Sequence, residues 1–266
     1  TRSVWADRGD IIATLEPSAA SLTRADFPEN AMLSADDLLI DWKLMPSVGR
    51  VLVIGQPPSG LGLDAFPSGW TRDHGPAFVL RPSARSRSLK ASRHQAAIVD
   101  WGYNAWGGKY PPWDADDEVP TRVGKALGLR VFHPGIVMEG GAVDFNGAGT
   151  VLTTTSCLLN KNRNPHLSKA EVEQYLMDYY GQQQVVWLGE GIEGDDTDGH
   201  IDDLARFVDE RTIVVGIEAD PQDANFKVLQ DARRRLARAR DHEGRPFEIV
   251  ELPMPRAVAH KGQRLP

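Results

Sequence analysis

Short apolar runs alternate with polar residues along this chain and are separated by turns that contain glycine and proline. Runs of this length that are rich in β-branched residues and bounded by turn residues are typical of β-strands. They predict strands at residues 50–54, 97–101, 130–133, 150–154, 184–188, 205–208 and 212–217. The Ser- and Arg-rich residues 81–94 predict a mobile hairpin tip or loop. The pattern therefore predicts a chain with many short strands.

Three segments carry the signals of helix starts and ends. The clearest spans residues 168–181, with Ser168 as N-cap and Glu171 completing a capping box. The others lie at 120–128 and from 221 to beyond residue 236. Several strands lie between successive helices, which argues against a plain βαβ sheet. The spacing favours repeated modules of several strands and one helix around an axis.

Composition narrows the class of protein and its partners. A chain of 266 residues, 41% hydrophobic, can bury the core of one large domain, and we expect residues 1–266 to be a single catalytic domain. The net charge is −7 and the arginine run at 233–240 fits a solvated helix face, so nucleic acid is not expected as a partner. No apolar run approaches the ~20 residues that span a membrane. The single cysteine, Cys157, suits a reducing cytoplasm.

Three short stretches place carboxylates beside glycine, aromatic or histidine residues. They are WTRDHGP at 70–76, MEGG at 138–141 and DDTDGHID at 195–202. A flat guanidinium or amidine cation is best held by paired carboxylates, and a proton-transfer reaction needs a group such as histidine. Together the stretches predict one site for a small cationic guanidine.

Asp73 and Trp70 are the candidate binding residues of the first stretch. The Gly-Pro turn that follows ends a strand and leaves Asp73 near a loop mouth. Asp73 would accept hydrogen bonds from guanidinium nitrogens, and Trp70 would provide an apolar or cation–π wall. An aspartate in an Asx-turn beside a core tryptophan explains the same residues equally well.

Glu139 precedes two glycines, which allow close backbone approach. A buried Glu139 would need a partner, and a histidine elsewhere is the natural one. Taken alone, this stretch favours a surface turn. We assign Gly141 of the glycine pair to substrate binding.

His200 and Asp202 are two residues apart, which on a strand places both side chains on one face. His200 could then move protons while Asp202 holds the cation. The acidic residues upstream could instead bind a divalent ion. Their spacing matches no calcium-loop or zinc pattern, so we expect no metal.

Residues 100–114 are dense in aromatic residues and glycine (DWGYNAWGGKYPPWD). This run is predicted to form a lid or pocket wall, with an Ω-loop packed on its own rings as the alternative. We assign Trp106 of this run to substrate binding.

These motifs, together with TTTSCLLNKNRNPHLSKAEVEQYL and GDDTDGHIDDLARF, strongly resemble the agmatine deiminases of the Porphyromonas-type peptidyl-arginine deiminase family. The resemblance covers roughly residues 70–253 in matching order. It implies an α/β fold, the five-bladed α/β-propeller (pentein) of the guanidine-modifying superfamily. It also implies hydrolysis of agmatine to N-carbamoylputrescine and ammonia, in the biosynthesis of putrescine and other polyamines, with no metal and no organic cofactor.

The same resemblance assigns roles to individual residues. Asp73 and Asp202 would grip the guanidinium nitrogens, and Trp70 would line the pocket. His200 would act as general acid and base. Glu139 would orient the imidazole of His200 and favour its charged form.

The family's nucleophile is a cysteine near the C-terminus, and we expect it beyond Pro266, which would leave the last blade of the propeller incomplete in this chain. Cys157 follows a β-type run and is flanked by leucines, so we expect a buried, inert thiol. Residues 1–66 do not show the family's usual opening.

Two alternatives to agmatine deimination stay open. One is a non-catalytic guanidine-binding relative that keeps the carboxylates without a nucleophile. The other is a deiminase that acts on peptidyl-arginine or free arginine. The sequence does not fix the oligomeric state, and a homo-oligomer is an open alternative.

Overall fold

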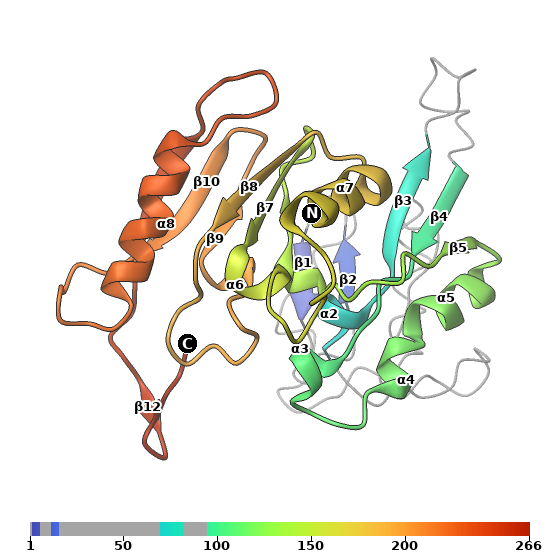
Figure 1. Ribbon diagram of the computed structural model, residues 1–266, viewed down its shortest axis with the longest axis horizontal. Coiled ribbons are helices and arrows are strands. Elements are labelled where there is room, and N and C mark those ends of the chain that lie inside the picture. Colours follow the sequence, from blue (N-terminus) through green and yellow to red (C-terminus); the bar gives the residue numbers. More distant parts are fainter. Residues whose placement is uncertain (1, 6–11, 16–69, 82–94) are drawn as a thin grey trace. The chain divides into compact units, whose positions relative to one another are not determined.

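The computed structural model describes residues 2–5, 12–15, 70–81 and 95–266 (Figure 1). The chain divides into two compact units, Thr1–Thr71 and Arg72–Pro266. In the first unit, β1 (Arg2–Trp5) pairs antiparallel with β2 (Ile12–Leu15). The predicted strand at 50–54 and most of the predicted loop, 82–94, lie outside the described residues.

Within the described part of the second unit, three sheets share one topology (Figure 1). In each sheet the middle strand pairs antiparallel with the strand before it and parallel with the strand after it. The sheets are β3 (Ala77–Arg81), β4 (Gln95–Val99) and β5 (Arg130–Phe132); β6 (Asp144–Phe145), β7 (Thr150–Thr154) and β8 (Gln184–Leu188); and β9 (Ala205–Phe207), β10 (Thr212–Ile217) and β11 (Glu248–Pro253).

Helices connect the parallel strands of each sheet, because a parallel pair cannot be joined by a tight turn. They are α3 (Ala105–Gly108), α4 (Asp114–Asp117) and α5 (Val119–Leu127) in the first sheet, α6 (Thr155–Leu158) and α7 (Lys169–Tyr180) in the second, and α8 (Phe226–Arg238) in the third. Each sheet with its crossover helices is a ββαβ module. A final hairpin consists of β12 (Ala259–His260) and β13 (Gln263–Arg264).

The middle module lies between two hydrophobic cores. Along β8, Val185 and Trp187 belong to one buried cluster, whereas Val186 and Leu188 belong to another. Successive residues of a strand point to opposite faces, so this alternation means that both faces of the sheet are buried. The second cluster also contains Leu229 of α8, which packs against β8 and β10. Burial on both faces explains why β7 is buried along its whole length.

The strands predicted at 150–154, 184–188 and 212–217 are confirmed with the same bounds, and those at 97–101, 130–133 and 205–208 with ends shifted by one or two residues. α7 follows Ser168 and carries both halves of the capping box. α8 begins at Phe226, because residues 221–225 form turns instead of its first part. The α/β class is confirmed, whereas the arrangement as a five-bladed propeller stays a prediction.

No helix in the described part of the chain has the length and hydropathy that a membrane crossing requires.

We predict that Ser168→Ala lowers the free energy of unfolding by about 1 kcal/mol, because the N–H of Glu171 loses its side-chain acceptor at the start of α7. Urea denaturation measures the change. Ser168→Thr is the matched control, because threonine keeps the hydroxyl of the capping box. Equal losses in the two variants would contradict the capping explanation.

Candidate active site

All predicted site residues except Trp106 lie in three short helical turns or directly before them, and each turn lies just before the first strand of a module. α2 (Thr71–His74) precedes β3, η2 (Gly140–Ala142) precedes β6, and η3 (Ile201–Asp203) precedes β9. η2 and η3 contact each other. Because the modules share a topology, similar positions in each of them supply one site. This repetition explains how residues far apart in the sequence converge.

Asp73, in α2, is fixed by hydrogen bonds to both oxygens. The backbone N–H of Gly141 donates to Oδ1 (2.8 Å), and the indole N–H of Trp106 donates to Oδ2 (3.1 Å). Burial raises the pKa of Asp73 to about 6, although both hydrogen bonds act in the opposite direction. Asp73 is therefore a preorganised carboxylate that is still charged at neutral pH.

His200 lies beside two carboxylates at the start of η3. Its Nδ1 is 3.8 Å from Oδ1 of Asp73 and 3.9 Å from Oδ1 of Asp202. Burial, reinforced by the positive charges of Arg163 and Arg72, lowers the pKa of His200 to about 3. The imidazole is therefore neutral at neutral pH. One ring nitrogen then carries the single proton and the other presents a lone pair.

Asp202 accepts a hydrogen bond from a guanidinium of the protein itself. Nε of Arg72 donates to Oδ2 of Asp202 at 2.8 Å, and the Arg72 side chain is half exposed. Burial raises the pKa of Asp202, and Arg72 acts to lower it. The contact shows that this carboxylate has the orientation to accept a guanidinium N–H.

Glu139 is fully buried and forms an ion pair with Arg163. Nε of Arg163 donates to Oε1 of Glu139 at 2.6 Å, and Sγ of Cys157 lies 4.0 Å from Oε2. Burial raises the pKa of Glu139, while Arg163 acts to lower it. The interpretation of this stretch as a surface turn is therefore wrong, and Arg163 holds the partner position predicted for a histidine. A permanently charged guanidinium compensates a buried carboxylate better than a neutral imidazole does.

Arg163 also fixes the loop that leads to His200. Its Nη1 donates to Oδ2 of Asp198 (2.6 Å), and its Nη2 donates to the carbonyl oxygen of Thr197 (2.8 Å). Asp198 has a left-handed backbone (φ 68°) and also accepts from Nζ of Lys109 at 2.7 Å. One buried guanidinium thus connects Glu139 to the backbone just before the histidine.

The two glycines of η2 are required by close contacts. A Cβ at Gly141 would lie 2.4 Å from Nδ1 of His200 and 2.8 Å from Oδ1 of Asp73. A Cβ at Gly140 would lie 1.8 Å from the carbonyl oxygen of Arg72. Only glycine therefore allows α2, η2 and η3 to approach so closely.

The aromatic run forms a turn that brings Trp106 to Asp73. Trp106 has a left-handed backbone (φ 56°), and the side chain of Asn104 accepts a hydrogen bond from Gly107 N at 2.8 Å. Tyr103 and Trp106 are buried together in a small cluster, whereas Tyr110 is 53% exposed. Part of the run therefore packs on its own rings, and its role as a lid or pocket wall stays a prediction.

Trp70 directly precedes α2, at the end of the first unit, and its side chain is 64% exposed. Its role in lining a pocket stays a prediction. His200 and Asp202 do not lie on a strand as expected, since His200 is the N-cap of η3 and Asp202 lies within it. The tight 3₁₀ turn nevertheless keeps both side chains near one another.

Sequence reasoning missed Arg163, Asp198 and Arg72 as parts of the site. A buried glutamate requires a positively charged partner, and this requirement could have indicated that an arginine or lysine belongs to the site. Nothing in the sequence indicated which of the chain's many arginines would provide it.

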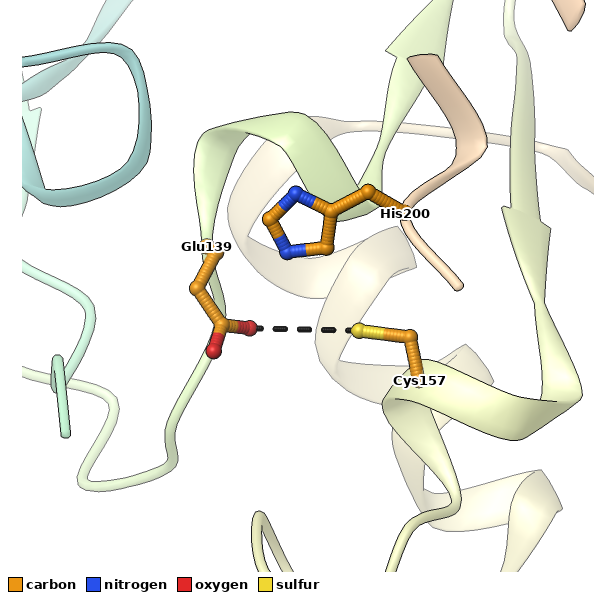
Figure 2. Close-up of side chains that lie close together, drawn as sticks. All are labelled: Glu139, Cys157 and His200. Atoms are coloured by element: carbon orange, nitrogen blue, oxygen red, sulfur yellow. Dashed lines mark hydrogen bonds between the residues drawn. The ribbon is translucent and has the colours of Figure 1, made fainter. Parts of the chain in front are cut away.

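Cys157 lies opposite the Glu139 carboxylate and beside the His200 ring (Figure 2). It is fully buried, and burial together with the charge of Glu139 raises the pKa of its thiol well above the usual value. The expectation of a buried thiol is confirmed. The acidic run offers little to a metal: Asp195 accepts from the N–H groups of Thr197 and Gly199, and Asp198 is paired with arginine and lysine.

The chain matches the Porphyromonas-type peptidyl-arginine deiminases over residues 64–266. It belongs to this family. The agmatine deiminase of Pseudomonas fluorescens is 39% identical over 191 residues, which are 70% of this chain and 49% of that protein. The predicted resemblance to the family is thereby confirmed.

Solved structures of family members have a similar fold. The agmatine deiminase of Enterococcus faecalis aligns with a TM-score of 0.65 and 37% identity, over 73% of this chain and 52% of that one. A Cys-to-Ser variant of the C. jejuni agmatine deiminase with bound substrate aligns with a TM-score of 0.62 and 34% identity, over 73% and 54%. The chain spans about half the length of the curated relatives that it matches.

We predict that affinity for a guanidinium ligand falls as the pH drops through about 6, because Asp73 attracts a cation only when deprotonated. Trp106→Phe removes an N–H donor that stabilises the charged carboxylate, and it should move the midpoint of this loss to higher pH. Calorimetric titration with agmatine across a pH series measures both midpoints. An unchanged midpoint in Trp106→Phe would show that the indole does not tune this carboxylate.

We predict that Arg163→Met lowers the free energy of unfolding by about 3–5 kcal/mol, because it leaves a buried carboxylate without its counter-charge. Adding Glu139→Gln removes that charge and should restore part of the loss. Chemical denaturation of the wild type, the two single variants and the double variant gives the free energies of unfolding for a double-mutant cycle. A double variant with a loss equal to the sum of the two single losses would exclude this coupling.

Proposed function

We propose that this protein hydrolyses the guanidine group of agmatine to N-carbamoylputrescine and ammonia. The observation that supports this best is the placement of two carboxylates, Asp73 and Asp202, within 4 Å of Nδ1 of a buried, neutral His200. The names and substrate-bound structure of the agmatine deiminases above support the choice of substrate.

The proposed binding mode follows from the charges of the site. A substrate guanidinium is flat, carries one positive charge and donates N–H groups in its plane, so it can bridge Asp73 and Asp202. Its charge would favour the ionised form of both carboxylates, whose pKa values burial raises. Arg72 would either retain its hydrogen bond to Oδ2 of Asp202 or be displaced from it by the substrate. Trp70 and Trp106 are proposed to border the bound cation.

The nucleophile is proposed to be a cysteine outside these 266 residues. The buried Cys157, with its raised pKa, is a poor source of thiolate. In the proposed reaction, His200 takes the thiol proton as sulfur bonds to the guanidinium carbon, and it passes this proton to the departing ammonia. His200 then removes a proton from the water that attacks the same carbon, and it returns this proton to the sulfur as the C–S bond breaks. Glu139 is proposed to orient the imidazole through its place behind the ring.

The wider arrangement is proposed on the same basis. The three ββαβ modules would be blades of a five-bladed propeller within one catalytic domain. The proposal includes a cytoplasmic location and a place in putrescine biosynthesis, but no catalytic metal, organic cofactor or nucleic-acid partner.

Peptidyl-arginine is the second candidate substrate, because the matching family carries that name. Both substrates present the same guanidinium to the carboxylates, and they differ in the group at the far end of the alkyl chain. Agmatine ends in an amine, whereas peptidyl-arginine continues into a peptide backbone.

We predict that protein made from the complete gene releases ammonia from agmatine faster than from an arginine-containing peptide. His200→Gln should lower kcat/KM for agmatine by about 10²–10⁴-fold, because it removes the proton-transfer group. Glu190→Gln, which changes an exposed carboxylate, is the matched control and should retain the wild-type rate. Faster release from the peptide would favour the second substrate. Binding of agmatine without any release would show a non-catalytic guanidine-binding protein.

A further inference from the structure

Behind the proposed site, three side chains of metal-ligand type converge in a fully buried cluster (Figure 2). Glu139, Cys157 and His200 each offer one ligand atom, and these atoms lie within 4.8 Å of one another. The residues come from separate parts of the second module and from the turn before the third. No other described group of His, Cys, Asp or Glu is gathered in this way.

Nε2 of His200 is the atom in this cluster that lacks a partner. The His200 side chain is only 3% exposed, and this nitrogen makes no hydrogen bond to any residue that the structure describes. The ring presents this nitrogen to Glu139 and Cys157 (Figure 2). A buried nitrogen without a hydrogen-bond partner is costly, and a cation bound there would give it a ligand bond.

We propose that Glu139, Cys157 and His200 bind one soft divalent cation, Zn²⁺ above all, and that this cation blocks the site. The ligands would be Oε2, Sγ and Nε2, because Arg163 already occupies Oε1 of Glu139. Sulfur, imidazole and carboxylate ligands suit Zn²⁺, whereas Mg²⁺ and Ca²⁺ require oxygen ligands. Zn²⁺ bonds of about 2.0–2.3 Å place tetrahedral ligand atoms about 3.5 Å apart. The 4.0 Å between Sγ and Oε2, and the other separations of up to 4.8 Å, would therefore shorten when the cation binds.

The charges of the cluster would balance. On binding, the Cys157 thiol forms the S–Zn bond and releases its proton to the solvent. The thiolate and Glu139 then neutralise the two charges of the cation, while Arg163 keeps its ion pair with Asp198. A cluster without net charge lowers the cost of burying the ion.

The functional consequence rests on the proposed reaction. A cation on Nε2 holds the ring proton on Nδ1 and leaves His200 no free lone pair with which to accept a proton, so Zn²⁺ would inhibit without contacting the substrate carboxylates. Metal binding itself does not depend on that reaction. An experiment can therefore contradict the proposed metal site without contradicting the proposed reaction, and the reverse.

Co²⁺ absorption spectroscopy of the untagged 266-residue chain tests the site directly. Cys157 is the only cysteine of this chain, so a thiolate-to-cobalt charge-transfer band can come from no other residue. We expect this band in the wild-type chain, its displacement by Zn²⁺, and its loss in Cys157→Ser. A wild-type chain without the band under saturating Co²⁺ overturns the proposal, whether or not the variant folds.

Two histidine variants show whether the rest of the cluster takes part. His200→Gln should weaken Co²⁺ binding by more than about 10- to 100-fold, the loss typical of residues that only support a metal ligand. His242→Gln, which changes a partly exposed histidine outside the cluster, should leave binding unchanged. Equal affinities in the two variants would exclude His200 as a ligand.

Inhibition is measured on protein from the complete gene, as the ratio of ammonia release with and without Zn²⁺. We expect Cys157→Ser to lose most of its sensitivity to Zn²⁺ relative to its own metal-free rate. Unchanged sensitivity would mean that Zn²⁺ inhibits at another group, and the claim of blockage would be wrong even if the cobalt band is present. An absence of ammonia release in any sample would instead contradict the proposed function.

Discussion

The buried guanidinium of Arg163 is the interaction on which the rest of the site depends. It contacts Glu139 from one module, and Asp198 and Thr197 from the loop that leads to the next. A charge in this position is tolerable only because each of its three nitrogens donates to an acceptor and because carboxylates offset it. The same contacts fix the backbone before His200. Arg163 thus links local electrostatics to the relative placement of two modules.

The burial that surrounds Arg163 also determines the protonation states of Asp73 and His200. Burial raises the pKa of Asp73 and lowers that of His200, so a charged carboxylate and a neutral imidazole coexist at neutral pH. Such a pair can hold a cation and accept a proton at the same time. A further carboxyl group, Asp203, has its pKa raised to about 7 by burial and by the nearby charge of Asp195. Its ionisation near neutral pH makes the charge of the site sensitive to pH.

Much of the fold could be predicted from local sequence, but less of the site. The bounds of β7, β8 and β10 follow from apolar runs between turns, and α7 follows from its capping box, because these signals act within a few residues. The motifs also identified the carboxylates and the histidine. Local signals did not reveal the 3₁₀ turn at His200 or the partner of Glu139. Both depend on contacts between segments distant in sequence, where tertiary packing overrides local preference.

The central claim is that Asp73 and Asp202 hold a guanidinium beside a neutral His200. A crystal structure of the protein from the complete gene, with agmatine bound to the His200→Gln variant, tests it most directly. We predict guanidinium nitrogens within hydrogen-bond distance, about 2.7–3.2 Å, of both carboxylates. A ligand whose guanidinium contacts neither Asp73 nor Asp202 would contradict the account.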